Sequence, residues 1–165
     1  MRKSLFLGVL VVSCIAAVVM AVESSDWAKG LFGEQLVKKD KTEVTTAEAL
    51  KGKQKVAVYF SAHWCPPCRA FTPKLVEAYN AAKEKGAKVE LVFVSSDRSE
   101  KDMYKYMEET KMEWLAVPFD GPRRKLGEKY GVRGIPTLIF LDGKGELISK
   151  EGRAEVMKKG AAAFE

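Results

Sequence analysis

The sequence predicts an α/β protein with a central mixed sheet flanked by helices, and three consecutive stretches carry this prediction. Residues 55–62 are a continuous apolar run of strand length, typical of a central strand covered on both faces. Residues 66–85 place apolar side chains along one helix face and end at Gly86. Residues 88–95 form a second buried strand pattern. A strand, a helix and a strand within about 40 residues predict a βαβ unit with a right-handed crossover.

The segments around this unit predict shorter elements. Before it, Leu36-Val37 and Val44 flank a charged turn and predict an N-terminal β-hairpin extension, followed by one helical turn at 46–50. After it, Ser99 and Asp102 have the spacing of a capping box and predict a helix through Thr110. The remaining expected elements are an apolar stretch at 114–119, a helix at 123–130, a hairpin of 138–141 with 146–149, and a closing helix at 153–164.

The first 22 residues have the layout of a secretory signal. Arg2 and Lys3 precede the apolar run 5–22, and cleavage after Ala21 fits the small residues there. The run is also long enough to cross a bilayer, so an uncleaved signal-anchor remains an alternative. A lipoprotein site at Cys14 is disfavoured because the apolar run continues beyond it. In each case the preceding positive charge predicts export of the body, into the secretory pathway, a periplasmic-type or extracellular space, or onto the non-cytosolic side of a membrane.

Size and composition predict a single domain after the leader. We divide the chain into a signal peptide or anchor at 1–22, a linker at 23–30 and one domain at 31–165. A chain of 165 residues with 47% hydrophobic residues can bury one ordinary core. The net charge of +6 is scattered and not interleaved with aromatic residues, which disfavours nucleic-acid binding. We expect a monomer whose only membrane contact is the possible N-terminal anchor.

The cysteines predict redox chemistry. Of three cysteines, Cys14 lies in the leader, which leaves Cys65 and Cys68 in the domain. A structural disulfide framework needs more pairs, and a zinc site needs about four ligands, whereas the only histidine is His63. We therefore expect no metal and no cofactor. A Cys-x-x-Cys between a strand and a helix is typical of a thiol–disulfide exchange site.

The position of each residue in this motif predicts its role. Cys65 at the helix N-terminus has its thiolate favoured, so it is the expected catalytic nucleophile. Cys68, one turn into the helix, is the expected resolving thiol. Pro66 and Pro67 rigidify the loop where backbone N–H groups are not needed, and both are expected to belong to the substrate-binding surface. Trp64 is expected to form apolar substrate-binding surface beside the sulfur. His63 is adjacent, but its side chain is expected to alternate away from its neighbours, which disfavours a general-base role.

Several blocks of sequence together resemble the thioredoxin superfamily, and in particular its tryparedoxin/nucleoredoxin group. The blocks are Trp64-Cys65-Pro66-Pro67-Cys68-Arg69, Gly131-Val132-Arg133-Gly134-Ile135-Pro136-Thr137, Ser61-Ala62-His63, Phe71-Thr72-Pro73, and residues 94–99 and 114–119. The resemblance covers about 31–153 and implies a thioredoxin-like fold. It also implies protein-disulfide reductase or related oxidoreductase activity, with protein disulfides or dithiols and a thiol electron donor or acceptor as partners.

The resemblance further implies a cis peptide before Pro136 and places Gly134, Ile135 and Pro136 opposite Cys65 as substrate-binding backbone. Two departures matter. Tyr59 stands where thioredoxin itself has a buried acid, so proton handling on the resolving thiol is not assigned. The export leader also differs from the cytosolic or nuclear setting common in the group. Two other functions remain open: a thioredoxin-like binding or chaperone module with secondary redox turnover, and a direct peroxidase, which the paired cysteines disfavour.

Overall fold

The structure is a computed structural model and describes residues 27–165. Its elements are β1 (Gln35–Val37), β2 (Glu43–Thr45), α2 (Thr46–Leu50), β3 (Lys55–Ser61), α3 (Pro66–Glu84), β4 (Val89–Ser95), α4 (Glu100–Glu109), β5 (Leu115–Ala116), α5 (Arg123–Tyr130), β6 (Thr137–Asp142), β7 (Leu147–Ser149), α6 (Gly152–Lys159) and the 3₁₀ helix η1 (Gly160–Phe164). The predicted leader at 1–22 lies outside the described residues. Within 27–165, none of the helices combines the length and apolar character that a bilayer crossing requires.

The seven strands form one mixed sheet in the order β2-β1-β5-β4-β3-β6-β7. β3 and β4 are parallel from the pair Lys55–Val89 to the pair Ser61–Ser95, which confirms the predicted βαβ unit. β6 runs antiparallel to β3, and β1 and β2 form the expected antiparallel hairpin. The sheet therefore has β3 near its centre, with the cysteine motif directly after its carboxyl end.

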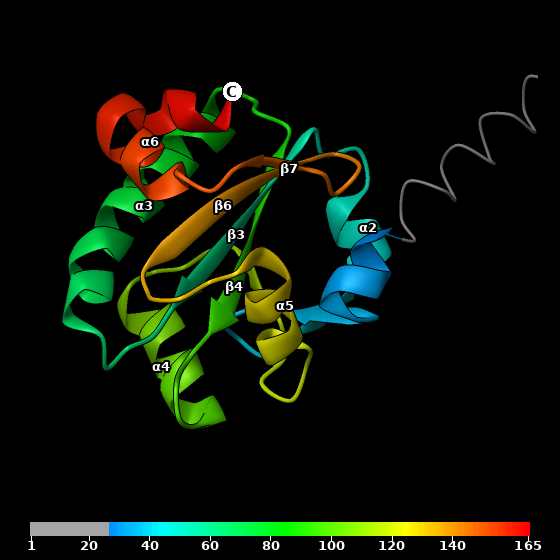
Figure 1. Ribbon diagram of the computed structural model, residues 1–165, viewed down its shortest axis with the longest axis vertical. Coiled ribbons are helices and arrows are strands. Elements are labelled where there is room, and N and C mark those ends of the chain that lie inside the picture. Colours follow the sequence, from blue (N-terminus) through cyan, green and yellow to red (C-terminus); the bar gives the residue numbers. More distant parts are fainter. Residues whose placement is uncertain (1–26) are drawn as a thin grey trace, which may run out of the picture.

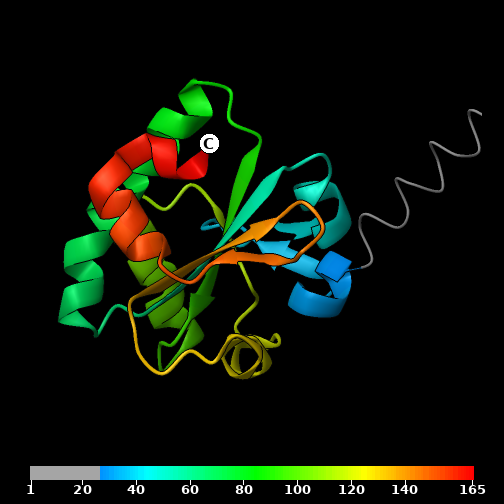
Figure 2. The ribbon, with the colours of Figure 1, turned by 45° about the horizontal axis from the view of Figure 1, so that its top comes forward.

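Helices cover both faces of the sheet, as Figures 1 and 2 show. α3, α4 and α6 lie on one face, and α2 and α5 lie on the other. Side chains of β3 alternate between the two cores: Ala57 and Tyr59 pack on the α3 side, whereas Val56, Val58 and Phe60 pack on the α5 side. This double burial explains why the strand reads as a continuous apolar run. It also directs the Tyr59 ring toward α3.

The ends of several elements follow from local chemistry. The Ser99 hydroxyl accepts a hydrogen bond from the Asp102 N–H at 3.1 Å, so the predicted cap of α4 is present. Gly131 ends α5 in the left-handed region, with φ of 65°. α6 stops before Gly160, whose φ is 56°, and the chain continues as η1 to Phe164 rather than as one closing helix.

The packed body extends further toward the N-terminus than we expected. Residues 27–30, which the sequence assigned to a linker with a helical turn at 27–32 as an alternative, are helical together with 31–32. Ala28 and Phe32 are fully buried in the core on the α5 side, and Trp27 packs against that core. These apolar contacts are made with residues distant in sequence, so the short segment itself gave little signal.

Candidate redox site

Cys65 and Cys68 lie where β3 passes into α3. Cys65 is the N-cap of α3, with extended backbone angles, and Pro66 and Pro67 are the first helical residues. The two cysteines are joined by a disulfide, with their Cα atoms 5.2 Å apart. The Cys68 N–H donates to the Cys65 sulfur at 3.3 Å. A backbone donor and the positive end of the helix thus both face this sulfur, and both favour negative charge on it.

The two sulfurs have different surroundings, although both cysteines are buried. Cys68 has no exposed surface, whereas Cys65 keeps 3%. Pro66 and Pro67, which separate them, are exposed. Trp64 is 53% exposed and directly precedes Cys65, so it forms an open apolar surface beside the motif.

The segment before β6 forms a wall beside the disulfide. The Ile135–Pro136 peptide bond is cis, as the family resemblance implies. The Cys65 sulfur lies 3.8 Å from the Ile135 carbonyl oxygen, and Ile135 packs against the buried cluster of Ala62, Cys65 and Cys68. Gly134 is exposed and Pro136 is buried. The structure therefore brings Cys65 next to Ile135, which lies 70 residues later in the chain. Both segments were selected as site residues in the sequence analysis.

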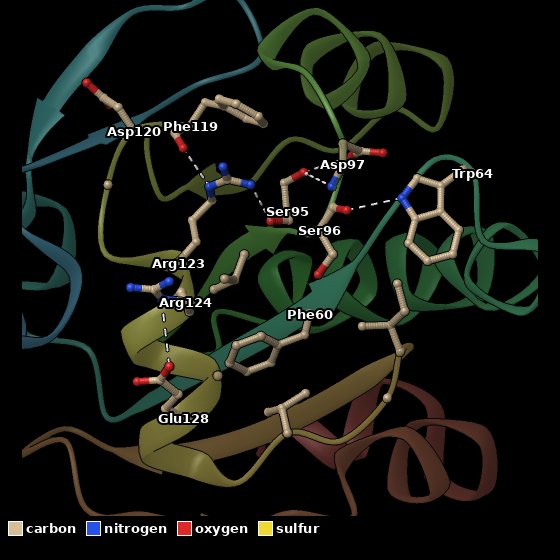
Figure 3. A pocket seen from close by; sticks show the side chains of 16 residues that line it. Phe60, Trp64, Ser95, Ser96, Asp97, Phe119, Asp120, Arg123, Arg124 and Glu128 are labelled. Carbon is tan, nitrogen blue, oxygen red and sulfur yellow. Dashed lines mark hydrogen bonds and ion pairs between the residues drawn. The ribbon is translucent and has the colours of Figure 1, made fainter.

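The turn after β4 holds the loop that leads into Cys65. The Ser96 N–H donates to the Ser61 carbonyl at 2.8 Å, and the Trp64 indole N–H donates to the Ser96 carbonyl at 3.1 Å (Figure 3). The His63 backbone N–H donates to the Asp97 carboxylate at 2.8 Å. Sequence reasoning assigned no role to Ser96 or Asp97. The only signal was the block 94–99 that took part in the resemblance.

Asp97 is a buried carboxylate fixed by its own turn. Only 6% of the residue is exposed, and its second oxygen accepts from the Ser95 hydroxyl at 2.8 Å. The Ser95 hydroxyl in turn accepts from the Asp97 N–H at 3.0 Å. Burial raises the pKa of Asp97 above its ordinary value, because removal from water disfavours the charged form. The hydrogen bonds from Ser95 and His63 oppose that shift.

A groove of about 780 Å³ extends from the motif toward α5. Trp64 and Ile135 line one part, and Arg123, Arg124 and Glu128 line another, as the close-up in Figure 3 shows for the labelled side chains. Arg123 is engaged by the protein itself: it donates to the Phe119 and Ser95 carbonyls at 2.6 and 2.8 Å. Arg124 and Glu128 form an exposed pair 3.7 Å apart.

The His63 side chain contacts residues of α4. Its Nε2 atom lies 2.9 Å from a Glu109 carboxylate oxygen, and its ring packs against Tyr106 at 5.5 Å between centroids. This arrangement agrees with the expectation that His63 is not a general base for Cys65. Among residues 27–165, no cluster of three or more His, Cys, Asp or Glu side chains could hold a metal ion.

Comparison with known proteins identifies the family. A family profile described as Thioredoxin-like matches residues 52–147. Nucleoredoxin from Danio rerio is 51% identical over 117 residues, which cover 70% of this chain and 27% of that protein. Nucleoredoxin from Homo sapiens is 51% identical over 113 residues, covering 67% of this chain and 25% of that protein. The chain thus spans about a quarter of the length of these relatives.

Solved structures agree with this result. Tryparedoxin II from C. fasciculata superposes with a TM-score of 0.74 at 36% identity, covering 82% of this chain and 89% of that one. Thioredoxin from Wuchereria bancrofti superposes with a TM-score of 0.71 at 45% identity, covering 78% and 89%. The predicted fold class and the predicted resemblance are both confirmed. This chain belongs to the thioredoxin-like family.

Proposed function

We propose that this protein is a thiol–disulfide oxidoreductase that exchanges the Cys65–Cys68 disulfide with protein partners. The observation that carries the proposal is the placement of the pair: Cys65 caps α3 beside the Ile135 carbonyl, and exposed Trp64 and the groove lie next to it. Cys65 keeps 3% exposed surface and Cys68 keeps none, so we expect a partner disulfide to approach the Cys65 sulfur. The nucleoredoxin and tryparedoxin relatives support this assignment.

In the reducing direction, the Cys65 thiolate attacks one sulfur of a partner disulfide. The partner's other sulfur leaves as a thiolate and takes up a proton, and a mixed disulfide forms on Cys65. Cys68 then loses its proton and attacks the Cys65 sulfur, which releases the second partner thiol. The protein ends as the Cys65–Cys68 disulfide, and the partner is reduced by two electrons. With a more oxidising pair of partners, the same steps run in reverse.

The substrate chain is proposed to lie across the wall formed by Gly134, Ile135 and Pro136. Gly134 is exposed and the Ile135 carbonyl lies beside the Cys65 sulfur, so an extended segment can meet this backbone and the sulfur together. Trp64 supplies apolar contact on the other side. One tryparedoxin II structure was solved complexed with glutathionylspermidine, so low-molecular-weight thiol conjugates are a second substrate class to assay.

Insulin reduction by dithiothreitol tests the proposal. The wild type should accelerate precipitation of the insulin B chain, and Cys65→Ser should abolish that acceleration. Cys68→Ser is the matched control, because it retains the nucleophile and should accumulate mixed disulfides that identify the natural partners. Full activity in Cys65→Ser would overturn the assignment.

Two further assays separate the other candidate functions. Unchanged partner capture by a Cys65→Ser/Cys68→Ser double variant would favour a binding or chaperone module. Peroxide consumption without an added peroxidase would favour direct peroxidase activity.

The site of action is proposed to be outside the cytosol, with the protein monomeric and residues 1–22 acting as a cleaved signal or an anchor. The support is the order of charge, apolar run and small residues at the N-terminus. Expression of the full chain followed by cell fractionation and intact-mass measurement tests this. A cytosolic protein that retains residue 1 would contradict the proposal.

A further inference from the structure

Four buried hydroxyl groups form a connected network behind Cys68. Tyr59 and Ser61 come from β3, Thr72 from α3 and Tyr106 from α4, and none of them has exposed surface. The Thr72 hydroxyl lies 2.8 Å from the Tyr59 hydroxyl and 2.5 Å from that of Tyr106. The Tyr106 hydroxyl lies 3.1 Å from that of Ser61. The Thr72 hydroxyl also donates to the Cys68 carbonyl at 2.9 Å.

The direction of every hydrogen bond in this network is determined by counting protons. A carbonyl cannot donate, so Thr72 uses its only hydroxyl proton on the Cys68 carbonyl. Tyr59 and Tyr106 must therefore both donate to the two lone pairs of the Thr72 oxygen. Since the Tyr106 proton is used there, the Ser61 hydroxyl must donate to Tyr106. All four protons point along one path that converges on Thr72 and ends at the backbone of Cys68.

The network also adds a hydrogen bond to α3 near Pro73, where the helix lacks one of its backbone hydrogen bonds. Thr72 is followed by Pro73, which has no N–H and cannot donate to the carbonyl one turn earlier. The first turns of α3 therefore have one fewer backbone hydrogen bond just after Cys68. The Thr72 hydroxyl adds a hydrogen bond to the Cys68 carbonyl in that same region. Burial raises the pKa of Tyr59 above its ordinary value, because removal from water disfavours the phenolate.

We propose that Thr72, fixed by Tyr59 and Tyr106, is a positioning residue for the resolving thiol of Cys68. This inference rests on the proposed function and concerns its second step. In that step the Cys68 thiol loses its proton and its sulfur bonds to Cys65, while the bond from Cys65 to the partner breaks and the partner leaves as a thiolate. Cys68 is part of a helix, so the distance between its sulfur and the Cys65 sulfur depends on the position of the helical turn that carries it. Two other elements, β3 through Tyr59 and α4 through Tyr106, hold that turn of α3 through the single Thr72 oxygen.

The reaction of the reduced protein with 5,5′-dithiobis(2-nitrobenzoate) resolves the two steps. Cys65 attacks the reagent and releases one thionitrobenzoate at a rate proportional to reagent concentration. Cys68 then displaces the second thionitrobenzoate at a rate that is independent of reagent concentration. Thr72→Val should slow the second phase about tenfold, the size expected from losing a buried hydrogen bond, and change the first phase by less than about twofold. Thr72→Ser keeps the hydroxyl and should restore the second phase.

Tyr79→Phe is the matched control for a general loss of stability. Tyr79 lies on the same helix, and its buried hydroxyl donates to a Glu90 carboxylate oxygen at 2.8 Å, away from the network. This variant should lose comparable stability yet leave both phases unchanged. An unchanged second phase in Thr72→Val, or an equal slowing in Tyr79→Phe, would overturn the proposal. If Thr72→Val does not fold, Tyr59→Phe and Tyr106→Phe test the proposal instead. Each variant should slow the second phase and leave the first phase unchanged. If neither variant slows the second phase, the proposal is refuted.

The proposed function fails in a different way from this inference. A first phase that persists at the wild-type rate in Cys65→Ser, where only the covered Cys68 thiol can react, would contradict the assignment of the nucleophile. The other outcome is a first phase that is normal in the wild type and lost in Cys65→Ser, together with an unaffected second phase in the Thr72 variants. That outcome would contradict only the positioning role.

Discussion

Replacing Asp97 with alanine should release the loop that precedes Cys65. The carboxylate accepts hydrogen bonds from the His63 N–H and the Ser95 hydroxyl, both at 2.8 Å, and the residue is 6% exposed. Hydrogen bonds to a charged acceptor are worth about 1.5–3 kcal/mol each, and removing the carboxylate would leave the His63 N–H and the Ser95 hydroxyl without their acceptor. We expect Asp97→Ala to lower the free energy of unfolding by about 2–4 kcal/mol. Insulin reduction should fall by about tenfold or more, because small displacements of reacting groups cost large factors in rate.

Asp97→Asn distinguishes the hydrogen bond from the charge. The amide keeps an oxygen that can accept from His63, so its stability should stay within about 1 kcal/mol of the wild type and most activity should remain. Asp120→Ala is a control in the same groove, since Asp120 is exposed. Urea denaturation and the insulin assay measure both quantities. Equal losses in Asp97→Asn and Asp97→Ala, or no loss in Asp97→Ala, would refute the reasoning that this carboxylate holds the loop through the His63 N–H.

Three further outcomes follow from the same contacts. Because burial raises the pKa of Asp97 above its ordinary value of 3.8, the folded state binds the proton more tightly than the unfolded state. The wild type should therefore gain stability relative to Asp97→Asn as the pH falls through the folded pKa toward 3.8. Urea denaturation at a series of pH values from 7 downward measures the difference in unfolding free energy between the two proteins, and a change of that difference in the opposite sense would contradict the prediction. Trp64→Ala should raise KM for insulin by roughly fivefold to tenfold with little change in kcat, since we propose that the half-exposed indole contacts substrate; a fall confined to kcat would disprove it. Ser99→Ala should lower stability by about 1 kcal/mol through loss of the bond from the Asp102 N–H, with unchanged insulin reduction as the check that α4 stays in place.

Much of the fold follows from local patterns in the chain. The β3–α3–β4 unit was predicted because double burial makes a strand continuously apolar and one-sided burial gives a helix its 3.6-residue period. The cap at Ser99 and the stop at Gly131 were predicted because both depend on residues within one turn. Residues 27–30 were not assigned to the domain, because the contacts that bury Ala28 come from distant parts of the chain.

The sequence by itself determined which chemistry to propose for the protein: two cysteines at the start of a helix, with prolines between them, predict a redox pair and the order in which the thiols act. The tertiary structure alone decided what surrounds them. Asp97, in the turn after β4, supports the loop before Cys65. Tyr59 and Tyr106 converge on Thr72, although these three residues come from β3, α4 and α3. Hydrogen bonds between such residues depend on strand register and helix packing across the sheet. A local pattern does not encode that geometry, because it is set only when the whole core is assembled.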